Sequence, residues 1–536
     1  MSSQNMNSDV IIIGGGIAGI ITAIELLDHN KKVILLDRDQ ESYFGGQAKE
    51  SFGGICLIDS PLQKKAGIRD NAELALSDWC SFAEFGAEDE LPKSWAKKYI
   101  ERSIEDVYLG LKKFGVKFFP VVHWVERGLY CPGNSVPRFH MVWGTGKGLI
   151  DRLVYALLNH PRRENLKLLF QHDVEHLIED DGRIVGCSGK NNNDKTEFSA
   201  NGDFVVLACG GIGANLDLVK KHWHKDWTSP PEKILIGCHR YADGKLHEEV
   251  KRHGGNITHL DKMWNYAAGI QHPNKDKPFG LSLVPPKSAL WMDFQGRRIG
   301  PVPLVTAYDT RFLVTEVCKR PKKYSWHILN WKIAEKELAV SGSEFNQAIR
   351  DKKLFSFLKT VIFGNKKLVK QLTSGSEDFV VAENLPELVK KMNELNGDQE
   401  VKLELLEKDI KQYDLCIDRG VKFHNDDQLR RITHLRQYPG DRLRTCKHQK
   451  ILDPQALPLI AIRLHILARK SLGGMQTDLD SKVLRSDSSQ IPGLYAVGEA
   501  AGFGGGGIHG LRALEGTFLG SCLVTGKAAA QSIVKS

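Results

Sequence analysis

The pattern of hydrophobic positions near the N-terminus predicts a strand, a turn, a helix and a second strand. Residues 10–13 form a continuous β-branched run, which is typical of a strand buried on both faces. Apolar residues then recur at helical spacing from Ile17 to Leu27, and residues 32–36 form a second apolar run. Because parallel strands require a crossover connection, this order indicates a βαβ unit.

Strand-like and helical patterns alternate along the rest of the chain. Further strands are expected at 167–171, 183–187, 204–208 and 493–497, and an apolar helix is expected at 514–534. Between these ends the pattern becomes charged and helical, as at 385–395 and 401–413. The change predicts an α/β protein in which a Rossmann-type domain (1–235 and 446–536) is interrupted by an inserted α+β capping domain (236–445).

The net charge of +9 is concentrated in one segment. Residues 319–371 contain 13 Lys and Arg against 4 Asp and Glu, so this segment equals the whole excess. A solvated helix face explains such a run better than nucleic-acid binding, and no nucleic-acid partner is expected. Within it, residues 352–370 alternate aromatic or aliphatic side chains with lysines, a pattern that suits weak peripheral membrane contact. A cap helix with its apolar face packed inward is the alternative.

The ten cysteines are scattered, and no two lie closer than Cys187 and Cys209. Without a CxxC pair, zinc, iron–sulfur and c-type haem sites are unsupported, so no metal is expected. Reduced thiols in a cytoplasmic protein are the simplest interpretation. The apolar run at 10–24 is broken by three successive glycines, and no stretch reaches the roughly 20 apolar residues of a membrane helix.

A dinucleotide-binding motif occupies the first turn. Gly14, Gly16 and Gly19 satisfy G-x-G-x-x-G directly after a predicted strand and at the opening of a helix. The first glycine permits the tight turn, the second lets the backbone approach a pyrophosphate, and the third allows close helix–strand packing. Asp37 ends the second strand 18 residues beyond Gly19, where it can accept hydrogen bonds from a ribose. The unit by itself does not distinguish FAD from NAD.

Three further segments resemble the fumarate reductase and succinate dehydrogenase flavoprotein superfamily, which also contains ketosteroid dehydrogenases. Residues 45–54, with two pairs of glycines, are similar to the stretch that lies along FAD in that superfamily. Residues 205–211 resemble its strand and turn behind the cofactor, and residues 493–502 resemble its C-terminal signature, in which the acid, here Glu499, contacts the ribityl chain. Residues 514–519 correspond to the helix start at the flavin's pyrimidine edge. The resemblance implies a discontinuous FAD-binding domain with an inserted cap.

The motif and the resemblance together name the expected cofactor-binding residues. They are Gly14, Gly16, Ile17, Ala18, Gly19, Asp37, Arg38, Gly45, Gly46, Gln47, Ala48, Ser51, Gly53, Gly54, Val174, Ala208, Gly210, Gly211, Gly498, Glu499, Thr517, Phe518 and Leu519. No histidine occurs within 45–54, where the similar succinate dehydrogenases attach FAD covalently, so non-covalent FAD is expected. Since no second dinucleotide motif or haem motif is present, electrons are expected to pass to a separate quinone, protein carrier or oxygen.

Four side chains are candidates for the chemistry. His509 and Arg512 precede the flavin-edge helix, in a stretch that carries a histidine and a carboxylate-binding arginine in fumarate reductases. When this stretch is aligned with that of fumarate reductases on Gly516, however, Ala513 occupies the position of that arginine. Lys470 replaces the substrate-binding histidine of the similar H-T-M-G-G pattern and is able to bind an oxyanion, whereas a surface lysine is the alternative. His140 lies in a short polar loop. A structural role is the alternative for His140, and also for the loop around His509.

These features predict an FAD-dependent oxidoreductase acting on a CH–CH bond of a carbonyl-bearing or steroid-like small molecule. For such chemistry one group stabilises charge on the carbonyl oxygen and another exchanges a proton at the adjacent carbon. An amine or amino-acid oxidase is the second possibility, because such enzymes share the βαβ opening. A non-enzymatic flavin carrier that docks a membrane or a partner through its basic segment is the third.

Overall fold

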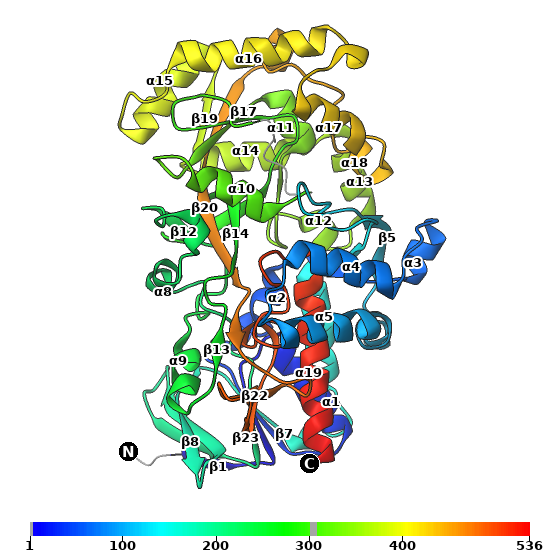
Figure 1. Cartoon of the computed structure of the whole chain (residues 1–536), viewed down its shortest axis with the longest axis vertical. Helices are drawn as coiled ribbons and strands as arrows, with labels where there is room; N and C mark the ends of the chain where they lie inside the picture. The colour runs from blue at the N-terminus through cyan, green and yellow to red at the C-terminus, as the bar shows by residue number, and fades with distance from the viewer. Residues whose placement is uncertain (1–3, 301–307) are drawn as a thin grey trace.

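The two ends of the chain fold together, and the middle of the chain forms a separate layer above them (Figure 1). The computed structural model describes residues 4–300 and 308–536. In Figure 1 the N-terminal segment and the C-terminal helix share the lower half, whereas residues from the middle of the chain fill the upper half. This is the discontinuous arrangement that the sequence predicts.

The lower half is built on a six-stranded sheet with β2 (Val10–Ile13) near its centre. The strand order is β22 (Lys482–Leu484), β23 (Gln490–Ala496), β11 (Phe204–Leu207), β2, β3 (Val33–Leu36) and β7 (Leu166–Leu169). All pairs are parallel except β22 with β23. Every residue of β2 and β3 is buried, as the continuous β-branched runs predict.

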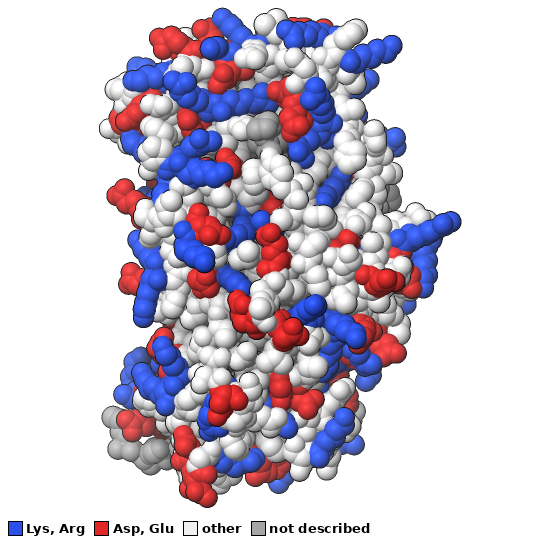
Figure 2. Space-filling model, viewed as in Figure 1, with Lys and Arg blue, Asp and Glu red and all other residues white. Residues whose placement is uncertain are grey.

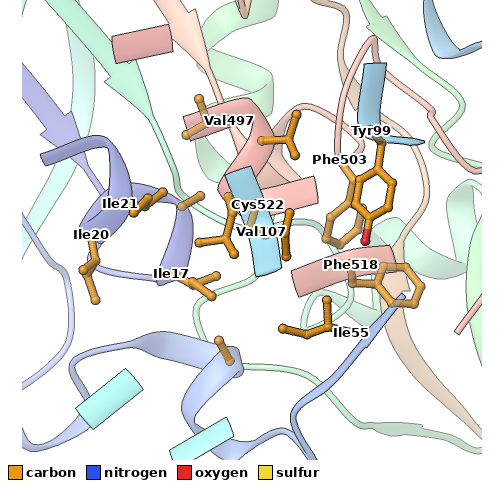
Figure 3. Close-up of a cluster of buried hydrophobic side chains, with 14 of the residues drawn as sticks. Ile17, Ile20, Ile21, Ile55, Tyr99, Val107, Val497, Phe503, Phe518 and Cys522 are labelled. Atoms are coloured by element: carbon orange, nitrogen blue, oxygen red, sulfur yellow. The ribbon is translucent and has the colours of Figure 1, made fainter. Parts of the chain in front are cut away.

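Helices cover one face of this sheet. Helix α1 (Ile17–Asp28) packs beside α19 (Thr517–Lys535) and α7 (Thr145–Leu158). Figure 3 shows the isoleucines of α1 on one side of the resulting apolar cluster and Phe503 and Phe518 on the other. The opposite face packs against a four-stranded sheet, in the order β1 (Gln4–Asn7), β10 (Glu197–Asn201), β9 (Arg183–Asn191) and β8 (His172–Asp180).

The cap is organised around one long strand, β20 (Leu459–Ser471). Its sheet has the order β16 (Leu290–Met292), β17 (Ser325–Asn330), β20, β14 (Met263–Gln271), β15 (Gly280–Val284) and β18 (Ala339–Val340). Strands β12 (Ile234–Ile236) and β19 (Phe379–Ala382) also pair with β20. Helices α10 (Thr310–Cys318), α15 (Leu385–Asn396) and α16 (Leu403–Asp418) complete the cap, and the last two match the helices expected from the charged pattern.

The cap ends later in the chain than the composition suggests. Strand β20 lies inside the cap sheet, so the cap extends to Ser471 and the expected boundary at 445 falls within it. The charged helical pattern ends before this strand. A buried apolar strand has the same sequence pattern in either domain, so the pattern does not reveal to which domain β20 belongs. The N-terminal edge of the cap, at β12, lies next to the expected boundary at 236.

Charged side chains of both signs are interspersed over the face shown in Figure 2. A continuous field of one sign, which steers nucleic acids, is absent from that face. Among the residues described, no helix is both long enough and apolar enough to cross a membrane.

Candidate active site

A large cavity lies between the glycine turn after β2 and the N-terminus of α19. Its volume is about 1550 Å³, including the space that is open to solvent at its mouth. All but four of the expected cofactor-binding residues line it. Gly19, Gly211, Gly498 and Thr517 are the four that lie behind the wall.

The glycine turn has the geometry that the motif requires. A Cβ atom on Gly14 would lie 2.3 Å from the carbonyl oxygen of Ala208, and one on Gly19 would lie 2.0 Å from the carbonyl oxygen of Gly14. Both glycines therefore permit close backbone packing. A Cβ atom on Gly16 meets no protein atom within 4 Å, because it would project into the cavity. This open position is where a pyrophosphate would approach the helix N-terminus.

The end of the cavity beside β3 suits a ribose. The carboxylate of Asp37 accepts a hydrogen bond of 2.8 Å from the backbone N–H of Gly15, and burial raises the pKa of this carboxyl group. The Arg38 guanidinium forms ion pairs with Asp243 at 2.6 Å and Asp173 at 3.3 Å. The sequence analysis did not include these two acids, because no motif marks the segments that contain them.

The opposite end of the cavity is bounded by α19 and the end of β20. Glu499 accepts a hydrogen bond of 2.9 Å from the backbone N–H of Ser471, and burial raises the pKa of this carboxyl group. Phe518 and Lys470 also line this end. The Lys470 ammonium lies 3.9 Å from the centre of the Phe518 ring and 4.5 Å from that of Trp264. Among the described residues, no carboxylate lies within 4.0 Å of it.

A β-bulge brings a second cation to this wall. Trp264 of β14 pairs with Lys470 and Asn265 pairs with Ala468, so Arg469 is the extra residue on β20. Successive side chains of a regular strand point to opposite faces, but Arg469 and Lys470 both line the cavity. Within the described part of the chain, Arg469 has no ion pair; it donates a hydrogen bond of 3.2 Å to the Ser341 hydroxyl. Sequence inspection missed Arg469, because periodicity does not reveal a bulge.

A second, smaller cavity of about 740 Å³ adjoins the first. Gln47, Ser341 and Arg469 line both cavities. The side-chain oxygen Oε1 of Gln47 is buried without a hydrogen-bond partner. The smaller cavity extends the larger one toward the cap.

The structure places His509 behind the cavity wall. Its ring is fully buried and stacks on Trp79, with the ring centres 5.9 Å apart. Phe503 and Phe518, which do line the cavity, lie between it and the open space, at ring-centre distances of 5.3 and 4.8 Å. Burial lowers the pKa of His509 to about 3, so its ring is neutral at physiological pH. The structure does not bring this residue to the surface that a substrate would touch.

Arg512 joins the two domains. Its Nε lies 3.0 Å from the carboxylate of Asp309, the N-cap residue of α10 in the cap, and its Nη1 forms an ion pair with Glu84. Arg512 is absent from the cavity lining. Nothing in its position supports the prediction that it holds a substrate oxygen.

His140 belongs to a buried polar network rather than to a solvated loop. It lies on β6 (Phe139–Val142), where Phe139 faces the cavity and the next side chain points away. The ring nitrogens of His140 hydrogen-bond with the Ser60 hydroxyl and the carbonyl oxygen of Arg138, both at 2.7 Å. Burial lowers the pKa of His140 to about 4. These contacts favour the structural alternative.

One group of potential metal ligands occurs among the described residues. Glu88, Asp89 and His259 offer ligand atoms within 4.8 Å of one another. The Lys262 ammonium already lies 3.3 Å from Asp89, so this group contains a cation of its own. We assign it no metal.

Three observations agree with FAD in the large cavity. The space facing Gly16 is free of protein atoms, an unpartnered amide oxygen of Gln47 is buried beside it, and the cavity reaches from Asp37 to the N-terminus of α19. The glycine turn would hold the pyrophosphate, Asp37 the ribose and Glu499 the ribityl chain, as the resemblance implies.

Comparison with known proteins identifies the family. The FAD binding domain family matches residues 9–519. The chain belongs to this family. A KsdD-like steroid dehydrogenase of Mycobacterium tuberculosis is 39% identical over 98% of this chain and 96% of the relative. A KsdD-like steroid dehydrogenase of Mycolicibacterium smegmatis is 38% identical over 96% of each chain.

Solved structures of the same fold agree with this assignment. The 3-ketosteroid Δ1-dehydrogenase of Sterolibacterium denitrificans superimposes with a TM-score of 0.72, at 14% identity and over 99% of both chains. An open flavocytochrome c3 fumarate reductase gives 0.70 at 18% identity, over 99% of this chain and 78% of the other. The protein is an FAD-dependent oxidoreductase of the class that acts on CH–CH bonds, and the predicted fold and activity class are confirmed.

Replacing Gly16 tests the cofactor site. We expect Gly16→Val to abolish FAD binding and leave the fold intact, because the added side chain would enter the cavity from a Cβ that meets no protein atom within 4 Å. The ratio of flavin to protein absorbance and the far-ultraviolet circular dichroism measure the two effects. Gly110→Ala is the control, since its Cβ would meet the flexible end of Lys527 at 3.2 Å and the carbonyl oxygen of Glu105 at an ordinary van der Waals distance of 3.7 Å. Full FAD content in Gly16→Val would contradict this assignment.

Proposed function

We propose that the protein dehydrogenates the CH–CH bond next to a ring ketone of a steroid-like substrate. The observation that carries the proposal is the pair of neighbouring cations, Arg469 and Lys470, on the wall of the FAD cavity. The KsdD-like steroid dehydrogenases, similar over nearly the whole chain, support the substrate class. When bound, FAD supplies the hydride acceptor, and the protein positions the substrate and removes a proton.

The two cations have different roles in this reaction. The planar guanidinium of Arg469 can donate two parallel hydrogen bonds, so it suits the carbonyl oxygen, where negative charge develops. Lys470 takes the proton from the carbon next to that carbonyl. The electron pair of this C–H bond becomes the new C=C bond, while hydride leaves the neighbouring carbon.

The surroundings of Lys470 suit a base. Burial and, as the second cause, the positive charge of Arg469 lower the pKa of its ammonium to about 7. The carboxylates of Glu515 and Glu499 and the Cys522 thiol act in the opposite direction. A base with a pKa near the working pH combines an available lone pair with adequate basicity.

A direct test of the activity uses anaerobic flavin absorbance. We expect 4-ene-3-ketosteroids to bleach the flavin without a separate acceptor, because hydride transfer reduces it. An absence of bleaching with a panel of 3-ketosteroids, combined with bleaching by amines, would favour the amine-oxidase alternative. The relatives described above give that alternative no support.

The pH dependence of kcat tests Lys470. We expect kcat to rise as the pH increases through about 7, because the neutral amine accepts the proton. Lys470→Met and Lys470→Arg should lower kcat by about 10²–10⁴-fold and remove the rise, since neither side chain is a base in this range. Lys408→Met, at an exposed position on α16, is the control.

The opposite pH profile would overturn this role. If kcat fell as the pH rose above 7, the protonated amine would be the active form. Lys470 would then act as an oxyanion donor, which is the role that the sequence first suggested. FAD content should remain unchanged in both variants, and loss of FAD would indicate a role in cofactor binding instead.

We further propose that FAD is bound non-covalently and reoxidised by a separate quinone, protein carrier or oxygen. Three histidines line the cavity: His172 and His239 lie beside Asp37 and Asp39 at the ribose end, and His247 lies on α9 (Lys245–Arg252), so none of them belongs to residues 45–54. Acid precipitation should therefore release all flavin as intact FAD. Yellow colour that stays in the pellet would contradict this expectation.

A cytoplasmic location is part of the same proposal. All ten cysteines are free thiols; six of them are buried and four are partly exposed. Reduced thiols are typical of a reducing compartment.

A further inference from the structure

Helix α13 (Leu354–Phe363) presents apolar side chains to solvent. None of its residues is buried, and Phe355, Phe363 and Ile362 are 88%, 70% and 59% exposed. A surface helix of a globular protein normally turns its apolar residues toward the core. The packed cap helix that the sequence offered as an alternative is therefore wrong for α13, but it holds for the next helix, α14 (Lys366–Gly375), whose Leu368, Val369 and Leu372 are buried in the cap core.

The helix is attached through its opposite face. Phe357 packs against Phe119 at a ring-centre distance of 5.4 Å and against Trp143 at 6.3 Å. Leu354, Leu358 and Ile362 recur every four residues, so they share one helical face, which points outward. The FAD-binding domain thus holds the helix with its apolar face outward, at the junction of the two domains near β5 (Phe118–His123) (Figure 1).

The segment that contains this face carries lysines and no acids of its own. Residues 352–370 contain six lysines and no Asp or Glu. All six are exposed: Lys352, Lys353, Lys359, Lys366, Lys367 and Lys370. Of these, only Lys366 lies within 4.0 Å of a described carboxylate, that of Glu335. The charges are therefore available to an external partner.

We propose that α13 and its flanking lysines dock the protein on an anionic lipid surface. Aromatic and aliphatic side chains bordered by lysines match the interface of a bilayer, where the rings enter the acyl boundary and the ammonium groups meet lipid phosphates. A second copy of this chain is a poor occupant, because a two-fold contact would bring two sets of lysines together. Without a partner, the apolar face of α13 stays exposed to water.

The position of the helix connects docking with access to the site. Residues 341–345, which line the second cavity, lead through α12 (Gln347–Arg350) directly into α13. That cavity shares Arg469 with the FAD cavity. If the protein docks through α13, the second cavity lies on the side of the lipid. This arrangement suits a sparingly soluble substrate. The docking itself does not depend on the proposed function.

Vesicle flotation of the FAD-loaded protein tests the proposal. We expect binding to phosphatidylcholine vesicles that contain about one-third phosphatidylglycerol at low salt, and weak binding to phosphatidylcholine alone. Phe355→Ser combined with Phe363→Ser should reduce binding about tenfold, because the inserted rings are lost. Phe423→Ser, at another exposed phenylalanine of the cap, should have no effect.

A second pair of variants isolates the charge. Lys359→Gln with Lys367→Gln should reduce binding about tenfold. Lys390→Gln with Lys411→Gln makes the same change in net charge on other exposed cap helices and should leave binding unchanged. FAD content and the thermal midpoint should stay the same in every variant.

Three outcomes of the flotation experiments would overturn the proposal. They are absence of wild-type binding, equal binding to neutral and anionic vesicles, and equal loss in the control variants. Light scattering of the lipid-free protein tests the remaining alternative, in which a second copy of this chain covers the face. If the phenylalanine variant converted a dimer to a monomer, this face would be a contact between copies of the chain instead of a lipid surface.

Discussion

The pairing of strand β20 with both its neighbours is the interaction on which cap and site depend. The first half of its thirteen residues pairs with β17 and β19 and the second half with β14 and β12, so it is the central strand of the cap sheet. The same strand ends at the FAD cavity. A bulge before that end turns two consecutive side chains, Arg469 and Lys470, to the cavity wall. The fold of the cap therefore fixes the position of both cations.

Two unpaired cations at one wall are electrostatically costly, and this cost has a functional consequence. Burial and the charge of Arg469 both lower the pKa of Lys470, whereas a guanidinium keeps its proton. One wall thus offers a permanent positive charge and a group able to exchange a proton. Aromatic rings of Trp264 and Phe518 partly compensate the Lys470 ammonium through cation–π contacts.

The nucleotide end of the site was predictable, whereas only Lys470 of the four catalytic candidates lines the cavity. Gly14, Gly16 and Gly19 act within one short turn, so their spacing in sequence specifies their geometry in space. His140 and Arg512 lie in equally suggestive segments, yet strand alternation turns the first away from the cavity and Asp309 of the cap engages the second. Such outcomes depend on partners far away in the chain. The same holds for the cap boundary, because β20 pairs only with strands from the middle of the sequence.

By itself, the sequence determined the Rossmann-type unit through local periodicity and short-range glycine spacing, and an inserted cap through the change to a charged helical pattern, while the resemblance of three further segments pointed to the FAD family. It also located a basic, aromatic segment at 352–370. Only the tertiary structure decided which charged side chains line the cavity and which face of α13 meets solvent. The physical reason is that register shifts and long-range ion pairs set the direction of a side chain, and neither leaves a periodic trace in the sequence.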